Sequence, residues 1–196
     1  MRQLVLCVLC GAALSYSQGN RRNGPLPDHG TVEVTVTPID QPASVQELTK
    51  RSQLIVEGEI VRILPTRQVN PDSPHSLETD SVIQLKRVLK GDQPSTTIAI
   101  SQVGGKLGTK EAIVKQDPLF KVGEQYVVFL VRDDRKQANT SGFARYLVVG
   151  VWSGRAKIEH GKVQFSDEAS PALRSQNNTT VESLVATIAK IAASQK

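Results

Sequence analysis

Cysteine is nearly absent from the chain, and the two cysteines that are present lie near its start. Cys7 and Cys10 fall inside an apolar run over residues 4–14. If that run is removed on export, the mature chain has no thiol, which excludes disulfides, thiol nucleophiles and thiolate metal sites. Roughly 180 residues follow, enough for one domain, which must then fold by burial of apolar side chains alone.

Aromatic residues and long apolar stretches are also scarce. Aromatics make up 4% of the chain, too few for the stacking platforms that bind single-stranded nucleic acids. The 24 basic and 19 acidic residues are interleaved, a distribution that favours solubility more than nucleic-acid binding. After the N-terminal run, no segment approaches the roughly 20 apolar residues of a membrane-spanning helix. We therefore expect no nucleic-acid partner and no stable membrane span in the mature chain.

The N-terminus has the pattern of an export signal. Arg2 precedes the apolar run, and small residues suited to cleavage follow it at Ala13, Ser15 and Ser17. This pattern predicts a signal peptide over residues 1–17, cleaved near residue 17, and a secreted or periplasmic mature protein. A buried N-terminal helix is the alternative. A lipid anchor is not expected, because leucine precedes each cysteine where a lipoprotein signal has a small residue.

The rest of the chain divides into a lead-in and one predicted domain. Residues 18–43 begin with a flexible Gly-, Pro- and Asn-rich stretch, and alternating valines over 31–37 then predict a half-buried strand or an extended arm. Residues 44–196 are expected to form a single OB-like domain. Capping boxes predict a helix at each end of it, one starting at Ser44 and the other at Thr179.

Two consecutive predicted strands, 54–64 and 81–90, change the side on which their apolar residues lie. In the first, Val56, Gly58 and Ile60 share a face, after which Val61 and Ile63 take over. A flat sandwich strand keeps one face buried, whereas strands of a small barrel coil, and bulges provide the bend. The fold class predicted is mainly β: a five- to six-stranded coiled OB-like barrel with a short N-terminal helix and a C-terminal helix. A β-sandwich is the alternative.

Further strands are predicted at 95–103, 125–133 and 144–154, with a hairpin over 155–165 that turns at His160-Gly161. Long polar loops are expected at 65–78, 103–110 and 134–142.

No pattern in the sequence matches a catalytic or metal site. His29, His75 and His160 lie in separate loops or turns, without a second ligand at zinc spacing, and are expected to be solvated. Asp133 and Asp134 are adjacent, so their side chains should point apart and serve turn formation and solubility. The loop 103–110, with three glycines and two lysines, matches neither nucleotide-binding motif, although it could bind another partner.

Three segments resemble, in the same order, the netrin-like domain of tissue inhibitors of metalloproteinases, complement C-terminal domains and procollagen proteinase enhancers. They read SQLIVEGEIVRI, IQLKRVLKGD and VGEQYVVFLV. Leu89-Lys90-Gly91 and Tyr126-Val127-Val128 match two short motifs of that family. The resemblance covers residues 44–133. The same order of segments is also similar to that of uncharacterised exported bacterial proteins. The resemblance implies an exported OB-type barrel. With no cysteine left after cleavage, inhibition through an N-terminal cysteine is not available to this protein.

The lack of a catalytic constellation, together with the long polar loops, favours an exported, non-enzymatic binding module. Its partner would be a protein or an extracellular glycan, met by the three loops. The candidate ligand-binding residues are Lys106, Lys110 and Trp152, the last of which is equally a candidate for the core or the barrel rim. Two alternatives remain open: a secreted hydrolase whose site only the fold assembles, and a loop-type protease inhibitor. No cofactor is predicted.

Overall fold

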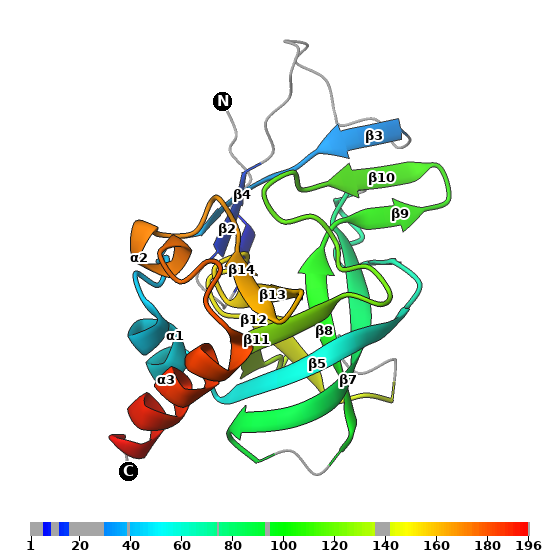
Figure 1. The fold of residues 1–196 in the computed structure, drawn as a ribbon. Helices are drawn as coiled ribbons and strands as arrows, with labels where there is room; N and C mark the ends of the chain where they lie inside the picture. The colour runs from blue at the N-terminus through cyan, green and yellow to red at the C-terminus, as the bar shows by residue number, and fades with distance from the viewer. Residues whose placement is uncertain are drawn as a thin grey trace.

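The computed structural model describes residues 6–8, 12–15, 30–38, 40–73, 75–92, 95–135 and 142–195 (Figure 1). His29, the start of the lead-in and most of the 134–142 loop lie outside the described residues. Two short strands, β1 (Leu6–Val8) and β2 (Ala12–Ser15), fall within the predicted signal peptide, whose cleavage stays a prediction.

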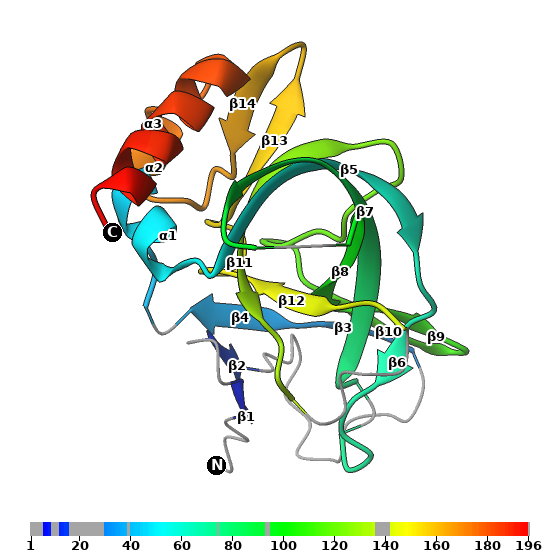
Figure 2. The ribbon, with the colours of Figure 1, turned by 90° about the horizontal axis from the view of Figure 1, so that it is seen from below.

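The centre of the fold is a closed barrel of five strands, which follow one another in space as β11, β5, β7, β8 and β12 before returning to β11. In Figure 2 these strands surround a common centre. Their bounds are Leu54–Ile63 for β5, Leu77–Lys90 for β7, Thr97–Val103 for β8, Gln125–Arg132 for β11 and Arg145–Val148 for β12. The predicted mainly β barrel with helices is confirmed, and the sandwich alternative is wrong.

The pairing of β5 with β7 is interrupted by three register shifts, which bend both strands around the barrel. One shift leaves Lys86 as an extra residue between Leu85 and Arg87, and another does the same for Val61 between Ile60 and Arg62. The predicted slip in both strands is therefore confirmed. Val61 itself is the bulged residue and is 43% exposed, so the expectation that it takes over the inner face is wrong, whereas Ile63 packs on the barrel core.

Gly58 lies where β5 and β7 come closest together. A Cβ atom on Gly58 would lie 2.4 Å from the carbonyl oxygen of Gln84 and 2.8 Å from the side chain of Ile83. The absence of a side chain therefore permits a close approach of the two backbones, because no residue with a side chain fits here without displacing β7.

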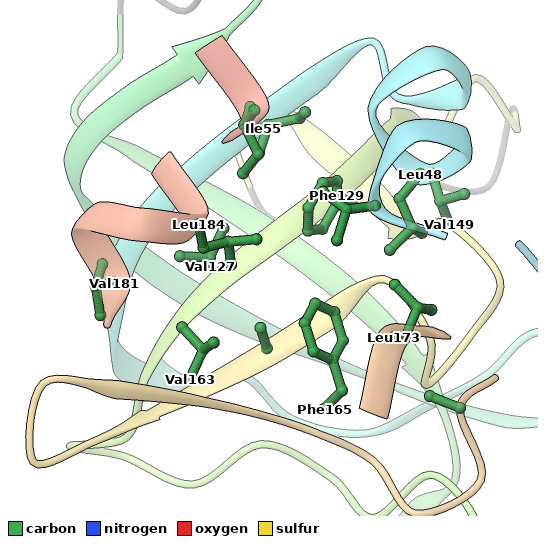
Figure 3. Packing of buried hydrophobic residues seen from close by; sticks show 14 residues of the cluster. Leu48, Ile55, Val127, Phe129, Val149, Val163, Phe165, Leu173, Val181 and Leu184 are labelled. Carbon is green, nitrogen blue, oxygen red and sulfur yellow. The ribbon is translucent and has the colours of Figure 1, made fainter. Parts of the chain in front are cut away.

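The apolar side chains form separate clusters on the two sides of the barrel wall. One cluster fills the barrel interior and includes Ile60, Ile83 and Val128. The other lies outside, between β11 and a cover made of the helices and a β-hairpin, and Figure 3 shows its residues. Because β11 contributes to both clusters, its residues are apolar on both faces, as its sequence predicts.

The outer cover consists of the hairpin β13–β14 and three helices. Its elements are β13 (Arg155–Glu159), β14 (Lys162–Phe165), α1 (Val45–Arg51), α2 (Pro171–Arg174) and α3 (Val181–Ala193). The predicted turn at His160 and Gly161 is confirmed, and both residues have positive φ angles of 50° and 75°. Helix α2 lies between the predicted hairpin and the predicted C-terminal helix.

The cap predicted at Ser44 is confirmed, although Glu47 reaches back to the N–H of Ala43 and not to that of Ser44, and the cap predicted at Thr179 is wrong by one residue. Ser44 accepts a hydrogen bond from the backbone N–H of Glu47 at 3.2 Å and so caps α1. At α3 the cap is Thr180, which accepts from the N–H of Ser183, and not Thr179. Glu182, which was expected to complete the second box, instead binds the guanidinium of Arg87 on β7.

A second small sheet lies beside the barrel, at the top of Figure 1. It consists of β3 (Gly30–Glu33), β10 (Lys110–Ile113) and β9 (Gly105–Leu107), and β4 (Thr35–Pro38) continues the chain from β3. The half-buried strand predicted over 31–37 is confirmed by β3 and β4. The loop predicted over 103–110 is wrong in part, because β9 and β10 form a hairpin there.

The segments around β6 and β12 also differ from expectation. Residues 65–78 contain β6 (Arg67–Gln68), which pairs with β7, and β7 begins at Leu77, so the polar loop is shorter than predicted. The strand predicted over 144–154 ends at Val148 and is followed by turns. Among the described residues, no helix has the length and apolar character needed to cross a membrane.

Candidate functional site

A groove with a volume of about 610 Å³ lies between the approach to β11 and the β13–β14 hairpin. Its lining comes from residues 115–126, from Arg155 and Lys157 on β13, from residues 164–168, and from Asn177. This volume is within the range of about 300–1,000 Å³ typical of ligand sites. We refer to this feature below as the groove.

Arg155 is a buried cation at the groove. Its guanidinium lies 2.9 Å from the carboxylate of Asp117 and donates a hydrogen bond of 2.8 Å to the carbonyl oxygen of Pro118. It also stacks over the ring of Phe120, 5.3 Å from its centroid. Arg155 and Asp117 are 8% and 6% exposed, so this buried pair fixes the segment 117–120 against β13.

Asp117 is a buried acid beside the groove, and its surroundings shift its pKa. Burial raises its pKa, although Arg155 and a hydrogen bond from Gln102 act in the opposite direction. Gln102 also donates to the carbonyl oxygen of Pro118 and accepts from the N–H of Phe120 at 2.9 Å. These contacts attach the segment to β8 as well as to β13.

Tyr126 and Glu124 form a second linked group beside Arg155. The Tyr126 hydroxyl donates to a Glu124 oxygen at 2.7 Å, and Lys157 lies 3.1 Å from the other oxygen. Burial, followed by the bond to Glu124, raises the pKa of Tyr126, so its phenol stays protonated at neutral pH. Burial alone would raise the pKa of Glu124, but the bonds from Tyr126 and Lys157 lower it.

Two further segments carry charges into the groove. Residues 115–121, the basic wall, contribute Lys115 and Lys121, and residues 166–168, the acidic wall, contribute Asp167 and Glu168. Lys115 pairs with Glu33 at 2.7 Å. No ion pair within the described part of the chain involves Lys121, Asp167 or Glu168. These three charges are therefore available to a ligand.

Trp152 is hydrogen-bonded to the backbone of the acidic wall. Its indole N–H donates to the carbonyl oxygen of Glu168 at 3.0 Å, and its ring is 5% exposed among Val34, Val36 and other apolar side chains. The expectation of a core aromatic therefore describes its position. Its side chain does not line the groove, so any effect on binding would act through Glu168.

The other two predicted ligand residues lie on the β9–β10 hairpin. Lys106 is exposed on β9, and Lys110 on β10 lies with its ammonium nitrogen 3.4 Å from the side-chain oxygen of Gln68. Neither lysine lines the groove. The structure thus does not bring Lys106, Lys110 and Trp152 together at the groove.

A cluster of three arginines and three carboxylates lies at another part of the barrel, around β6, β8 and the start of β12. Arg67 and Arg145 both pair with Asp80, at 2.7 and 3.1 Å. Glu78 accepts from Arg135 at 2.6 Å, and Asp133 pairs with Arg135 at 2.8 Å. The three positive charges of the arginines equal the three negative charges of the carboxylates, so the cluster has no formal net charge.

The expectation for Asp133 is wrong in one respect and right in another. The Asp133 side chain is fully buried in the cluster and does not serve solubility, whereas the Asp134 side chain is 83% exposed. The two carboxylates therefore point apart, as predicted. Burial alone would raise the pKa of Asp133, but hydrogen bonds from Arg135 lower it.

The cluster contains a serine beside a carboxylate, the type of pair that a hydrolase could use. Ser101 donates to Glu78 at 3.2 Å and accepts from Arg145 at 2.9 Å. Glu78 is also bound by Arg67 at 2.7 Å and by Arg135 at 2.6 Å. Ser101 and Glu78 are therefore both held within the ion-pair cluster.

The two histidines that the structure describes do not line the groove. His75 is fully buried in the segment that precedes β7, so the expectation of a solvated turn residue is wrong for it. His160 is exposed in its hairpin turn, as expected. Within the described ranges, no group of three His, Cys, Asp or Glu side chains could hold a metal ion.

Sequence reasoning missed the groove because its parts are distant in the chain. Asp117 and Arg155 stand on either side of the whole of β11 and β12, and neither forms part of a recognisable motif. The only local signal is the turn-rich stretch before β11. No protein-family model matches the sequence, and no curated protein sequence matches it either.

Proposed function

We propose that the protein is an exported, non-enzymatic binding module that holds a polar ligand in the groove. The observation that carries this proposal is the buried Arg155–Asp117 pair. Buried ion pairs are an inefficient way to stabilise a fold, because desolvation offsets much of their attraction. A pair that fixes the groove segment to β13 and β8 is better accounted for by the need for a rigid, pre-organised groove.

We place the ligand in the groove and not on the three loops first expected to bind it. Of those loops, residues 65–78 pair with β7 through β6 and bury Ser73, His75 and Ser76. The hairpin 105–113 is a second exposed feature. The groove has the additional property of a hollow surface with free charges, which supports it as the binding surface.

The netrin-like relationship is part of the same proposal. A closed, bulged barrel with a helix before its first strand and another at the C-terminus is compatible with the exported OB-type barrel that the resemblance implies. Such a relationship favours a binding role, although fold alone does not determine function.

The proposal can be tested by affinity capture from the medium or envelope of the source organism. The groove variant exchanges charges across the groove, Lys121→Glu with Glu168→Lys. The hairpin variant does the same for an opposed pair on β9 and β10, Lys106→Glu with Glu111→Lys. Both variants keep the net charge of the protein.

We expect the wild type and the hairpin variant to capture the same partner, and the groove variant to lose it. Loss with the hairpin variant alone would place binding on β9–β10 and overturn the proposal. Turnover of a generic ester or peptide by the wild type, without any capture, would instead favour the hydrolase alternative.

A further inference from the structure

The charges of the groove differ in whether they are already neutralised. Arg155 is paired with Asp117, and Lys157 with Glu124 and Glu159 at 3.1 and 2.9 Å. These groups shape the groove but have little charge left for a ligand. The charges that remain are Lys121 on the basic wall and Asp167 and Glu168 on the acidic wall.

The remaining charges have opposite signs and belong to different segments. A ligand that satisfies both must carry cationic and anionic groups. An acidic polysaccharide would be repelled by Asp167 and Glu168, and a neutral oligosaccharide would leave all three charges without partners. A polypeptide segment with basic and acidic side chains matches both walls.

A second observation, an unsatisfied side-chain oxygen, is compatible with the same class of ligand. The side-chain oxygen of Gln116, which lines the groove, is buried and accepts no hydrogen bond from any described residue. Buried acceptors in folded proteins nearly always have a donor. A backbone N–H of a bound peptide can provide it after the Gln116 side chain turns toward the groove.

We propose that the ligand of the groove is an extended protein segment that carries both signs of charge. Its basic side chains lie against Asp167 and Glu168, its acidic side chains against Lys121, and a backbone N–H donates to Gln116. This inference depends on the proposed function, since it names the class of ligand for the same groove.

The test uses backbone NMR of the full chain with defined probes. The first probe is a peptide with the sequence Lys-Thr-Glu-Thr repeated twice, in which threonine favours an extended backbone. The second replaces every charged residue of that peptide with glutamine. The third and fourth are a neutral cello-oligosaccharide and a heparin-derived oligosaccharide.

We expect the charged peptide to shift the amides of residues 115–126 and 164–168, with its affinity falling as salt is added. The Asp167→Asn/Glu168→Gln variant should weaken this binding about five-fold, the combined effect expected of two exposed charge interactions. The Lys106→Gln/Glu111→Gln variant should leave the affinity unchanged.

Three results would overturn the inference. The glutamine peptide could bind as tightly as the charged one, either oligosaccharide could shift the groove amides more strongly, or the charged peptide could shift none of them. Groove shifts produced by an oligosaccharide would leave the proposed binding function in place. Failure of every probe, together with failure of affinity capture, would remove both.

Discussion

At the scale of single residues, the barrel depends on a position that has no side chain. Gly58 allows the backbones of β5 and β7 to approach at the point where both strands bend, and a Cβ there would collide with the carbonyl of Gln84. A collision with backbone cannot be relieved by a rotamer change, so the strands themselves must shift.

Gly58→Ala is therefore expected to lower the free energy of unfolding by about 1–3 kcal/mol, the usual range for overpacking. Urea denaturation measures this loss. Val61→Ala is the control, because Val61 is the exposed bulge residue of the same strand and should change stability little. Equal stability of the two variants would contradict the close approach.

The ion pair between Asp133 and Arg135 should make the stability of the fold depend on pH. The Asp133 pKa is lower than its ordinary value of 3.8 in the folded protein, because hydrogen bonds from Arg135 outweigh burial. A carboxyl with a lowered folded pKa stabilises the fold above its unfolded pKa, and this contribution is lost as the pH falls through the folded pKa.

Arg135→Gln should destabilise the protein by about 1–3 kcal/mol at pH 7, since it leaves a buried acceptor with fewer donors. The difference from the wild type should shrink below about pH 4, where the unfolded carboxyl becomes protonated. Denaturation at several pH values measures both effects. Arg132→Gln, at a half-exposed neighbour, is the control and should show no such pH dependence.

Trp152 predicts a local effect on the groove. Trp152→Phe keeps an aromatic ring in the core but removes the hydrogen bond to the Glu168 carbonyl. We expect a loss of about 1 kcal/mol in stability and NMR shifts concentrated at residues 166–168. Shifts spread evenly over the molecule would argue against a specific support for the acidic wall.

At the scale of elements, the start of α3 is decided by one hydrogen bond. Thr179 and Thr180 both precede the helix, and the sequence favoured Thr179 because Glu182 stands three residues later. In the structure Glu182 is bound by Arg87, while Thr180 caps Ser183 and Thr179 donates to the carbonyl of Gln176. Glu182 thus bonds to a distant strand and does not close a box with Thr179, and the cap lies at Thr180.

Thr180→Ala should cost about 0.5–2 kcal/mol and speed hydrogen exchange at the Ser183 amide, because that N–H loses its acceptor. Thr179→Ala is the matched variant and should leave exchange at Ser183 unchanged. Faster exchange at the Glu182 amide in the Thr179 variant, with exchange at Ser183 unchanged in the Thr180 variant, would restore the capping box that the sequence predicted.

The elements that sequence reasoning found are those with local causes. The slipped alternation in β5 and β7 predicted the bulged barrel, and Ser44 predicted α1. Asp133 could not be assigned correctly, because its partner Arg145 reaches it only when β12 closes against β11. Its neighbours in sequence showed only a charged turn.

At the scale of the whole molecule, the barrel and its outer cover together create the groove. The approach to β11 belongs to the barrel, and the β13–β14 hairpin belongs to the cover. The groove therefore exists only where the barrel and the cover meet. The edge of β14 is not open to a further strand, because Asn177 accepts a hydrogen bond from the N–H of Phe165. A ligand is thus expected in the groove and not along that edge.

Photo-crosslinking from the groove tests this account most directly. A benzophenone amino acid replaces Leu119, which lines the groove, or Leu107, which is 39% exposed on the β9–β10 hairpin. Each protein is irradiated in the medium or envelope of its source and analysed by mass spectrometry. The account predicts one recurrent polypeptide adduct at position 119 and none at 107, whereas the same adduct at 107 alone would contradict it.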